Sequence, residues 1–138
     1  MPVASRNCPC KLADTSEMSV GSEWLVDAAG CDAVALTSLA VLRELFERII
    51  RQLDLHPLHE PQFHVFPEPS GITGFVMLSE SHLACHTYPE YGTITLNLYC
   101  CRPRPEWPWR EQLAELLGAT SVTVREFERA TQEVAAWQ

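Results

Sequence analysis

The chain has 138 residues and a formal net charge of −8, with 46% hydrophobic and 20% charged residues. This length and balance fit one folded domain with a single hydrophobic core and exclude a disordered chain. The negative charge argues against binding along a nucleic-acid backbone, and no apolar stretch approaches the ~20 residues that span a bilayer. Because no apolar block follows the N-terminal residues, we expect no secretory signal and a cytoplasmic protein.

The first part of the chain predicts a leader, a strand and a helix. Residues 1–20 are polar and aperiodic, which indicates a flexible leader, and residues 21–138 are expected to form a single domain. The stretch Glu23–Ala29 predicts a strand that ends at Gly30. A helix with Thr37 or Ser38 as its cap follows, since apolar residues recur at spacings of three and four: Leu39, Leu42, Leu45, Phe46, Ile49, Ile50 and Leu53.

The second part predicts mostly strands. Pro108 and Gly118 suit the start and end of a second helix, whose inner face carries Trp109, Leu113, Leu116 and Leu117. Strands are predicted over 62–66, 72–78, the segment from 81, 93–99 and a last stretch with Val122 and Val124. This order predicts an α+β fold, a two-layer α/β sandwich with a mostly antiparallel sheet and helices on one face.

The six cysteines give no metal-binding pattern. In a chain without a secretory signal we expect them to be reduced. Their spacing matches no zinc ribbon or finger, and we predict no metal site. They are Cys8, Cys10, Cys31, Cys85, Cys100 and Cys101.

Chemically reactive side chains gather between Ser79 and Gly92. This segment holds two serines, two imidazoles, a thiol and two carboxylates, and it follows the apolar run Phe75–Leu78. A short apolar run of this kind is typical of a buried strand. The sequence therefore predicts reactive groups at the end of a rigid core element.

Two familiar chemistries fit this segment poorly. His82 and His86 have the spacing of a zinc-protease helix, but the intervening glutamate is missing, the sequence is strand-like and no third ligand is near. A serine hydrolase elbow needs glycines two residues on either side of the nucleophile, whereas Ser81 has Ser79 and Leu83 there.

Self-processing fits better. The hydroxyl of Ser81 can attack the carbonyl of Glu80, turn the peptide into an ester and lead to a pyruvoyl group. Such a reaction needs a positioned peptide bond, a group that moves protons and donors for the oxyanion. His86 is a candidate for the proton transfers, and Thr73 supplies a hydroxyl if its strand pairs with the next as a hairpin. Residue types alone leave open that these are ordinary polar side chains beside a strand.

The segment closely resembles the prokaryotic S-adenosylmethionine decarboxylase proenzyme family, from about Trp24 to Val124. The motifs that carry the resemblance are Gly30-Cys31-Asp32, Gly71-Ile72-Thr73-Gly74, Ser79-Glu80-Ser81-His82 and His86-Thr87-Tyr88-Pro89-Glu90. The resemblance implies cleavage between Glu80 and Ser81, which gives a β chain of residues 1–80 and an α chain of residues 81–138. Ser81 then becomes the covalent pyruvoyl cofactor, which forms a Schiff base with the substrate.

The resemblance also implies roles for other residues. His86 acts in processing, Cys101 donates the proton that replaces the lost carboxylate, Glu90 holds the ribose hydroxyls and Phe66 stacks on adenine. Thr73 is also implied to bind the substrate. It stands where the family commonly has serine, so the hydroxyl is kept. The implied enzyme is a homodimer of αβ units, with active sites at or near the interface. It decarboxylates S-adenosylmethionine and supplies the aminopropyl donor for spermidine synthesis.

Some positions depart from the family pattern. Asn97 stands where many members have aspartate, and Cys100-Cys101-Arg102 replaces Thr-Cys-Gly. The turn after Phe66 is one residue longer. Cys100 is an adjacent rival to Cys101, and in an alternating strand the two side chains point to opposite faces.

These departures lie mostly on the substrate side and leave two alternatives. The first is a pyruvoyl-dependent ornithine or arginine decarboxylase on the same fold, because an acidic protein suits a cationic substrate. The second is an unprocessed, non-catalytic paralogue that binds a partner. Ser81, His86 and Cys101 are all present, which favours an enzyme.

Overall fold

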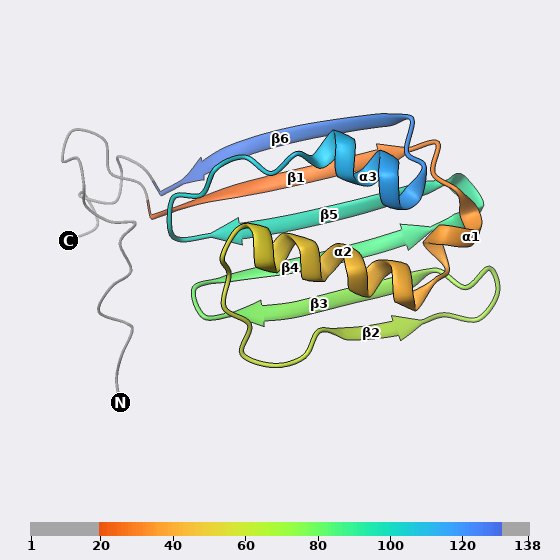
Figure 1. Cartoon of the computed structure of the whole chain (residues 1–138), viewed down its shortest axis with the longest axis horizontal. Helices are drawn as coiled ribbons and strands as arrows, with labels where there is room; N and C mark the ends of the chain where they lie inside the picture. The colour runs from red at the N-terminus through yellow and green to blue at the C-terminus, as the bar shows by residue number, and fades with distance from the viewer. Residues whose placement is uncertain (1–19, 131–138) are drawn as a thin grey trace.

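The computed structural model describes residues 20–130 as a six-stranded antiparallel sheet with helices on one face (Figure 1). The strand order is β2-β3-β4-β5-β1-β6. The elements are β1 (Gly21–Ala29), α1 (Ala33–Leu36), α2 (Leu39–Gln52), β2 (Gln62–Val65), β3 (Ile72–Leu78), β4 (Ser81–Tyr88), the 3₁₀ turn η2 (Pro89–Tyr91), β5 (Thr93–Cys100), α3 (Trp109–Leu117) and β6 (Ser121–Arg129). The predicted fold class is confirmed. The leader predicted for residues 1–20 lies outside the described residues except at its last position.

The element boundaries mostly follow from caps that the sequence displays. Ser38, one of the two predicted caps, accepts a hydrogen bond from the Val41 N–H at 3.2 Å and starts α2. Gly118 ends α3 with φ 73°, a conformation that favours glycine. Pro108 is the N-cap of α3, one position before its predicted place in the first turn. The short helix α1 was not predicted, since four residues are too few to show a helical period.

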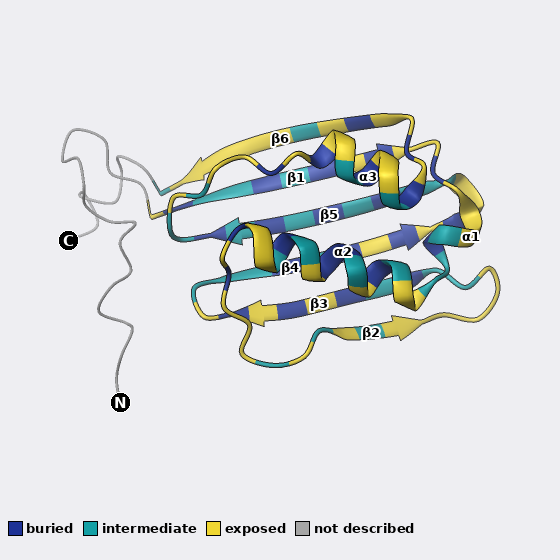
Figure 2. Cartoon of the chain, in the orientation of Figure 1, coloured by how far each residue is buried: buried dark blue, intermediate teal, exposed yellow. Residues whose placement is uncertain are grey.

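The core lies between the sheet and the two longer helices (Figure 2). Buried residues alternate with less buried ones along β3, β4 and β5, so every second side chain points toward the helices. The helices bury one stripe each: Leu42, Leu45, Phe46 and Ile49 from α2, and Trp109, Leu113 and Leu117 from α3. The opposite face of the sheet, which we call the open face, has no helix over it within residues 20–130 (Figure 1).

One buried hydroxyl joins the sheet to the helical layer. Thr87, near the end of β4, is 4% exposed. Its Oγ1 accepts a hydrogen bond from the Ile72 N–H at 2.8 Å and donates one to the Leu36 carbonyl at 2.9 Å. Both backbone groups would otherwise lack a partner in a dry interior, which is costly. Thr87 therefore fixes the start of β3 and the end of α1 relative to β4.

No helix within residues 20–130 is long and apolar enough to cross a membrane.

Candidate active site

The predicted cleavage site lies at a two-residue hairpin turn. Leu78 at the end of β3 pairs with Ser81 at the start of β4, which leaves Ser79 and Glu80 as the turn. Backbone hydrogen bonds hold the turn from two sides. The Ser79 N–H donates to the His56 carbonyl at 2.9 Å, and the Cys101 N–H donates to the Glu80 carbonyl at 3.2 Å. The carbonyl that Ser81 would attack is therefore fixed by a backbone donor.

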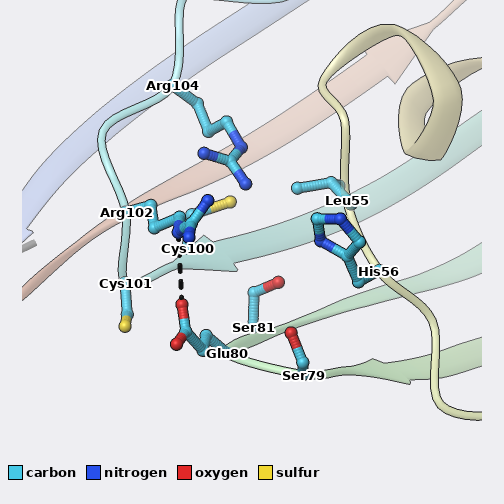
Figure 3. A pocket seen from close by; sticks show the side chains of 9 residues that line it. All are labelled: Leu55, His56, Ser79, Glu80, Ser81, Cys100, Cys101, Arg102 and Arg104. Carbon is cyan, nitrogen blue, oxygen red and sulfur yellow. Dashed lines mark ion pairs between the residues drawn. The ribbon is translucent and has the colours of Figure 1, made fainter. Parts of the chain in front are cut away.

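A cavity of about 240 Å³ opens beside this turn (Figure 3). The hydroxyl of Ser81 is directed toward it in Figure 3. The residues that line the cavity come from the turn, from the end of β5 with the loop after it, and from the segment after α2. They are Leu55, His56, Ser79, Glu80, Ser81, Cys100, Cys101, Arg102 and Arg104.

The two adjacent cysteines point in different directions. Cys100 is paired with Ser81 across β5 and β4, is 2% exposed, and its thiol forms a hydrogen bond with the Ser81 side chain. Burial raises the pKa of Cys100 to about 11, so this thiol stays protonated at neutral pH. The Cys101 sulfur is directed away from Ser81 (Figure 3). The two side chains thus point apart, as alternation along a strand predicts.

The expectation that the cysteines are reduced is wrong for Cys101. Cys101 is disulfide-bonded, while Cys31, Cys85 and Cys100 are free. In this form Cys101 carries no thiol proton, and it must be reduced before it can act as an acid.

The other predicted site residues form a second cluster. Thr73 and His86 pair across β3 and β4, as the predicted hairpin requires, and Thr73 Oγ1 shares a hydrogen bond of 3.0 Å with His86 Nδ1. Both residues line a cavity of about 280 Å³ together with Phe66 and Glu90. The structure thus gathers the four residues that were predicted for processing and substrate binding on this side.

The two clusters do not meet within one chain. His86 lies five residues beyond Ser81 along β4, which corresponds to about 16 Å at the rise of an extended strand. The burial pattern of β4 also places Ser81 in phase with buried Leu83 and Cys85, whereas His86 is exposed on the open face. A single copy therefore does not bring His86 to the Glu80–Ser81 peptide.

His82 is held by side-chain contacts on the open face. His82 Nε2 donates to Asn97 Oδ1 at 3.0 Å, and Asn97 Nδ2 donates to Glu23 Oε2 at 2.8 Å. The His82 ring also stacks on Tyr99 with centroids 5.8 Å apart. Within residues 20–130, no three histidine, cysteine or acidic side chains gather where a metal ion could bind.

Four lining residues of the Ser81 cavity were not predicted. Leu55 and His56 reach it because the Pro57 segment forms a bridge to Leu78, a long-range contact without a sequence signal. Arg102 did have a signal, because it stands where the family resemblance implies glycine, and it lies beside Glu80. Arg104 had none.

The chain is similar to known proteins over most of its length. The family model described as S-adenosylmethionine decarboxylase matches residues 22–130. The chain is 32% identical to the S-adenosylmethionine decarboxylase proenzyme of Picrophilus torridus, over 84% of this chain and 88% of the relative. It is 34% identical to that of Acetivibrio thermocellus, over 83% and 92%. The crystal structure of adenosylmethionine decarboxylase from Aquifex aeolicus superposes with a TM-score of 0.66 and 28% identity, covering 80% of this chain and 91% of that one.

Proposed function

Because this chain belongs to the S-adenosylmethionine decarboxylase family, we propose that it decarboxylates S-adenosylmethionine after cutting its own backbone between Glu80 and Ser81. The observation that supports this most directly is the geometry of the hairpin turn. The Glu80 carbonyl accepts a hydrogen bond from the Cys101 N–H, and Ser81 lies beside a cavity. A fixed carbonyl, an adjacent hydroxyl and a backbone donor are what an acyl shift requires.

The cut would proceed in three steps. The Ser81 hydroxyl adds to the Glu80 carbonyl carbon, the C–N bond breaks, and an ester with a free Ser81 amine results. Loss of the Ser81 α-proton then breaks the bond between Cβ and the ester oxygen, which releases Glu80 as a carboxylate and leaves a dehydroalanine. Water replaces the nitrogen of that group, ammonia leaves, and the pyruvoyl carbonyl remains.

The pyruvoyl group would supply an electrophilic carbonyl that draws electrons from the substrate as its carboxylate leaves as CO₂. The chain's own residues would bind and orient the substrate. Glu90 would accept hydrogen bonds from the ribose hydroxyls, and the half-exposed ring of Phe66 would stack on adenine. Cys101, once reduced, would donate the proton that replaces the carboxylate.

We further propose that the active site is shared between two copies of the chain. One copy separates Ser81 from the Thr73–His86 pair, so the site is incomplete in a monomer. The open face carries apolar side chains that are close to half exposed, Phe75, Met77 and Phe127, as expected of a surface that a partner covers. A two-fold axis that runs across the strands would place the Ser81 end of one copy over the His86 end of the other.

The reaction would serve polyamine synthesis. Decarboxylation of S-adenosylmethionine leaves an aminopropyl group on sulfur, which is the donor for spermidine synthesis in this family. We place the reaction in the cytoplasm. The ornithine or arginine decarboxylase alternative and the non-catalytic paralogue are not favoured, since the relatives named above are S-adenosylmethionine decarboxylases.

The substrate is tested by measuring CO₂ release from carboxyl-labelled S-adenosylmethionine, ornithine and arginine under the same conditions, with added reductant. We expect release from S-adenosylmethionine alone, and none from Ser81→Ala, which lacks the hydroxyl that starts the cut. Release from ornithine or arginine but not from S-adenosylmethionine would contradict the proposed substrate. The Ser81→Ala variant controls for contaminating enzymes.

A further inference from the structure

The Ser81 cavity holds more positive than negative charge. Its lining includes two guanidinium groups, Arg102 and Arg104, and one carboxylate, that of Glu80 (Figure 3). The Arg102 Nε lies 3.4 Å from Glu80 Oε1, and the two side chains are only 34% and 23% exposed. In a cavity with limited access to water, an unbalanced cation attracts an anion more strongly than it would at the surface.

Each of the two guanidinium groups has one buried N–H donor without a hydrogen-bond acceptor among the described residues. The Nε atoms of Arg102 and Arg104 are buried and make no hydrogen bond within the described residues, because the Arg102–Glu80 contact is an ion pair without hydrogen-bond alignment. Arg104 is otherwise anchored, since it donates to the carbonyls of Asp54 at 3.3 Å and Pro103 at 3.2 Å. Buried donors without a partner are rare in proteins and usually have a reason.

Self-cleavage would create the missing anion at this place. We propose that Arg102 and Arg104 form the binding site for the α-carboxylate that the cut leaves on Glu80. This inference rests on the proposed self-cleavage. Before the cut one carboxylate faces two cations; the cut adds a second carboxylate on the same residue, and the charges balance. The positive and negative charges of the cavity are thus equal in the cleaved chain and unequal in the intact one.

The two arginines would assist the step in which the ester breaks. In the first step the Glu80 carbonyl oxygen gains charge, and the Cys101 N–H at 3.2 Å stabilises it. In the second step the same carbon becomes part of the leaving carboxylate, whose charge would develop at the cavity that the two guanidinium groups line. Arginine suits this role because its planar donors match the geometry of a carboxylate. Arg102 and Arg104 would also retain the new C-terminus after the cut.

A different anion fits the cavity less well. The carboxylate of the substrate must leave as CO₂, and two cations paired with it would stabilise the charge that has to be lost. The Glu80 α-carboxylate is a product that stays in place, so tight pairing favours the reaction. In addition, Arg102 already contacts the residue on which this carboxylate forms.

The test is the rate of self-cleavage, followed by denaturing intact-mass spectrometry of freshly made full-length chain. We expect Arg102→Ala and Arg104→Ala each to slow the cut by about 10-fold, the effect of losing one charge-assisted hydrogen bond. The lysine variants keep the charge and should cut faster than the alanine variants. Arg43→Ala is the matched control, because this exposed arginine on α2 contacts the Phe63 ring and does not line the cavity. Circular dichroism checks that each variant folds.

A Glu80→Gln variant separates charge balance from simple positioning. If the arginines bind the new carboxylate, removing the competing charge of the Glu80 side chain speeds the cut relative to the wild type. If Arg102 only positions Glu80, Glu80→Gln slows the cut as Arg102→Ala does, and the inference is wrong.

The remaining outcomes are also decisive. Unchanged cleavage in the arginine variants, with a raised KM for the substrate, would assign the pair to the substrate carboxylate and overturn the inference while the proposed function stands. A wild-type chain that never cuts would overturn both.

Discussion

Two variants that cannot cleave alone should restore cleavage when they are made together. Ser81→Ala removes the hydroxyl that attacks the Glu80 carbonyl, and His86→Ala removes the imidazole proposed to move protons. In a pair formed by one chain of each kind, one of the two sites contains Ser81 from one copy and His86 from the other. That site has all of its groups, and the second site lacks both.

The size of the effect follows from the geometry. His86 lies five residues along β4 from Ser81, about 16 Å away, which is beyond the reach of a hydrogen bond or of one bridging water. Removing a general acid–base group slows a reaction by about 10²–10⁴-fold, so His86→Ala alone should remain almost uncut on the wild-type time scale. With equal amounts of the two chains and random pairing, about half of the His86→Ala chains meet a Ser81→Ala partner. Cleavage should therefore approach about half of the His86→Ala chains, under the same random-pairing assumption.

The assay is co-expression followed by denaturing intact-mass spectrometry, which distinguishes the two chains by mass. A Ser81→Ala/His86→Ala double variant in place of Ser81→Ala is the control, since it pairs equally well but supplies no imidazole. An uncut mixture would refute the shared site. Normal cleavage of His86→Ala on its own would refute the role of His86 in processing.

Three further predictions concern the fold and the thiols. Replacing Thr87 by valine leaves two buried backbone groups without their hydrogen bonds and should lower the free energy of unfolding by about 2–4 kcal/mol. Replacing it by serine keeps the hydroxyl and should lower the free energy of unfolding less. A urea titration of each variant measures both values. The hydrogen bond from Asn97 holds the pKa of Glu23 below its ordinary value. The ionised carboxylate therefore stabilises the fold above the ordinary pKa, and this stability is lost as the pH falls through the lowered pKa. Glu23→Gln should lose less stability than the wild type between about pH 6 and 3. Removing the thiol of Cys101 should lower kcat by about 10²–10⁴-fold, whereas Cys100→Ala should keep kcat within a few-fold. The wild type should need a reductant to decarboxylate, because Cys101 is disulfide-bonded. A large loss of kcat in Cys100→Ala, with little loss on removal of the Cys101 thiol, would assign the proton to Cys100.

The fold was largely predictable because its signals are local. Alternating burial along β3 and β5 and the apolar stripe of α2 follow the periods that a strand and a helix impose on a sequence. The short helix α1 was missed for the same reason, because it has too few residues to display a period.

The candidate site was predictable only in part. The Thr73–His86 hydrogen bond follows from hairpin pairing, which adjacent strands often adopt, and the structure has it. The separation of His86 from Ser81 also follows from strand geometry, since five residues of an extended strand change both the distance and the face. The sequence analysis did not predict this separation, because Ser81 and His86 lie close together in one motif of the sequence.

Long-range contacts could not be predicted from spacing. His56 accepts a hydrogen bond from the Ser79 N–H although the two residues are far apart in the sequence. The charge of the Ser81 cavity likewise depends on the path of the loop after β5, which brings Arg102 and Arg104 to the same cavity as Glu80 (Figure 3). No local pattern in the sequence predicts the path of that loop.

The most direct test of self-processing is the denaturing intact mass of the purified wild-type chain. We predict two fragments that meet between Glu80 and Ser81, the C-terminal one lighter by one molecule of ammonia than a fragment that begins with serine. A single intact chain that stays intact on long incubation would contradict the account.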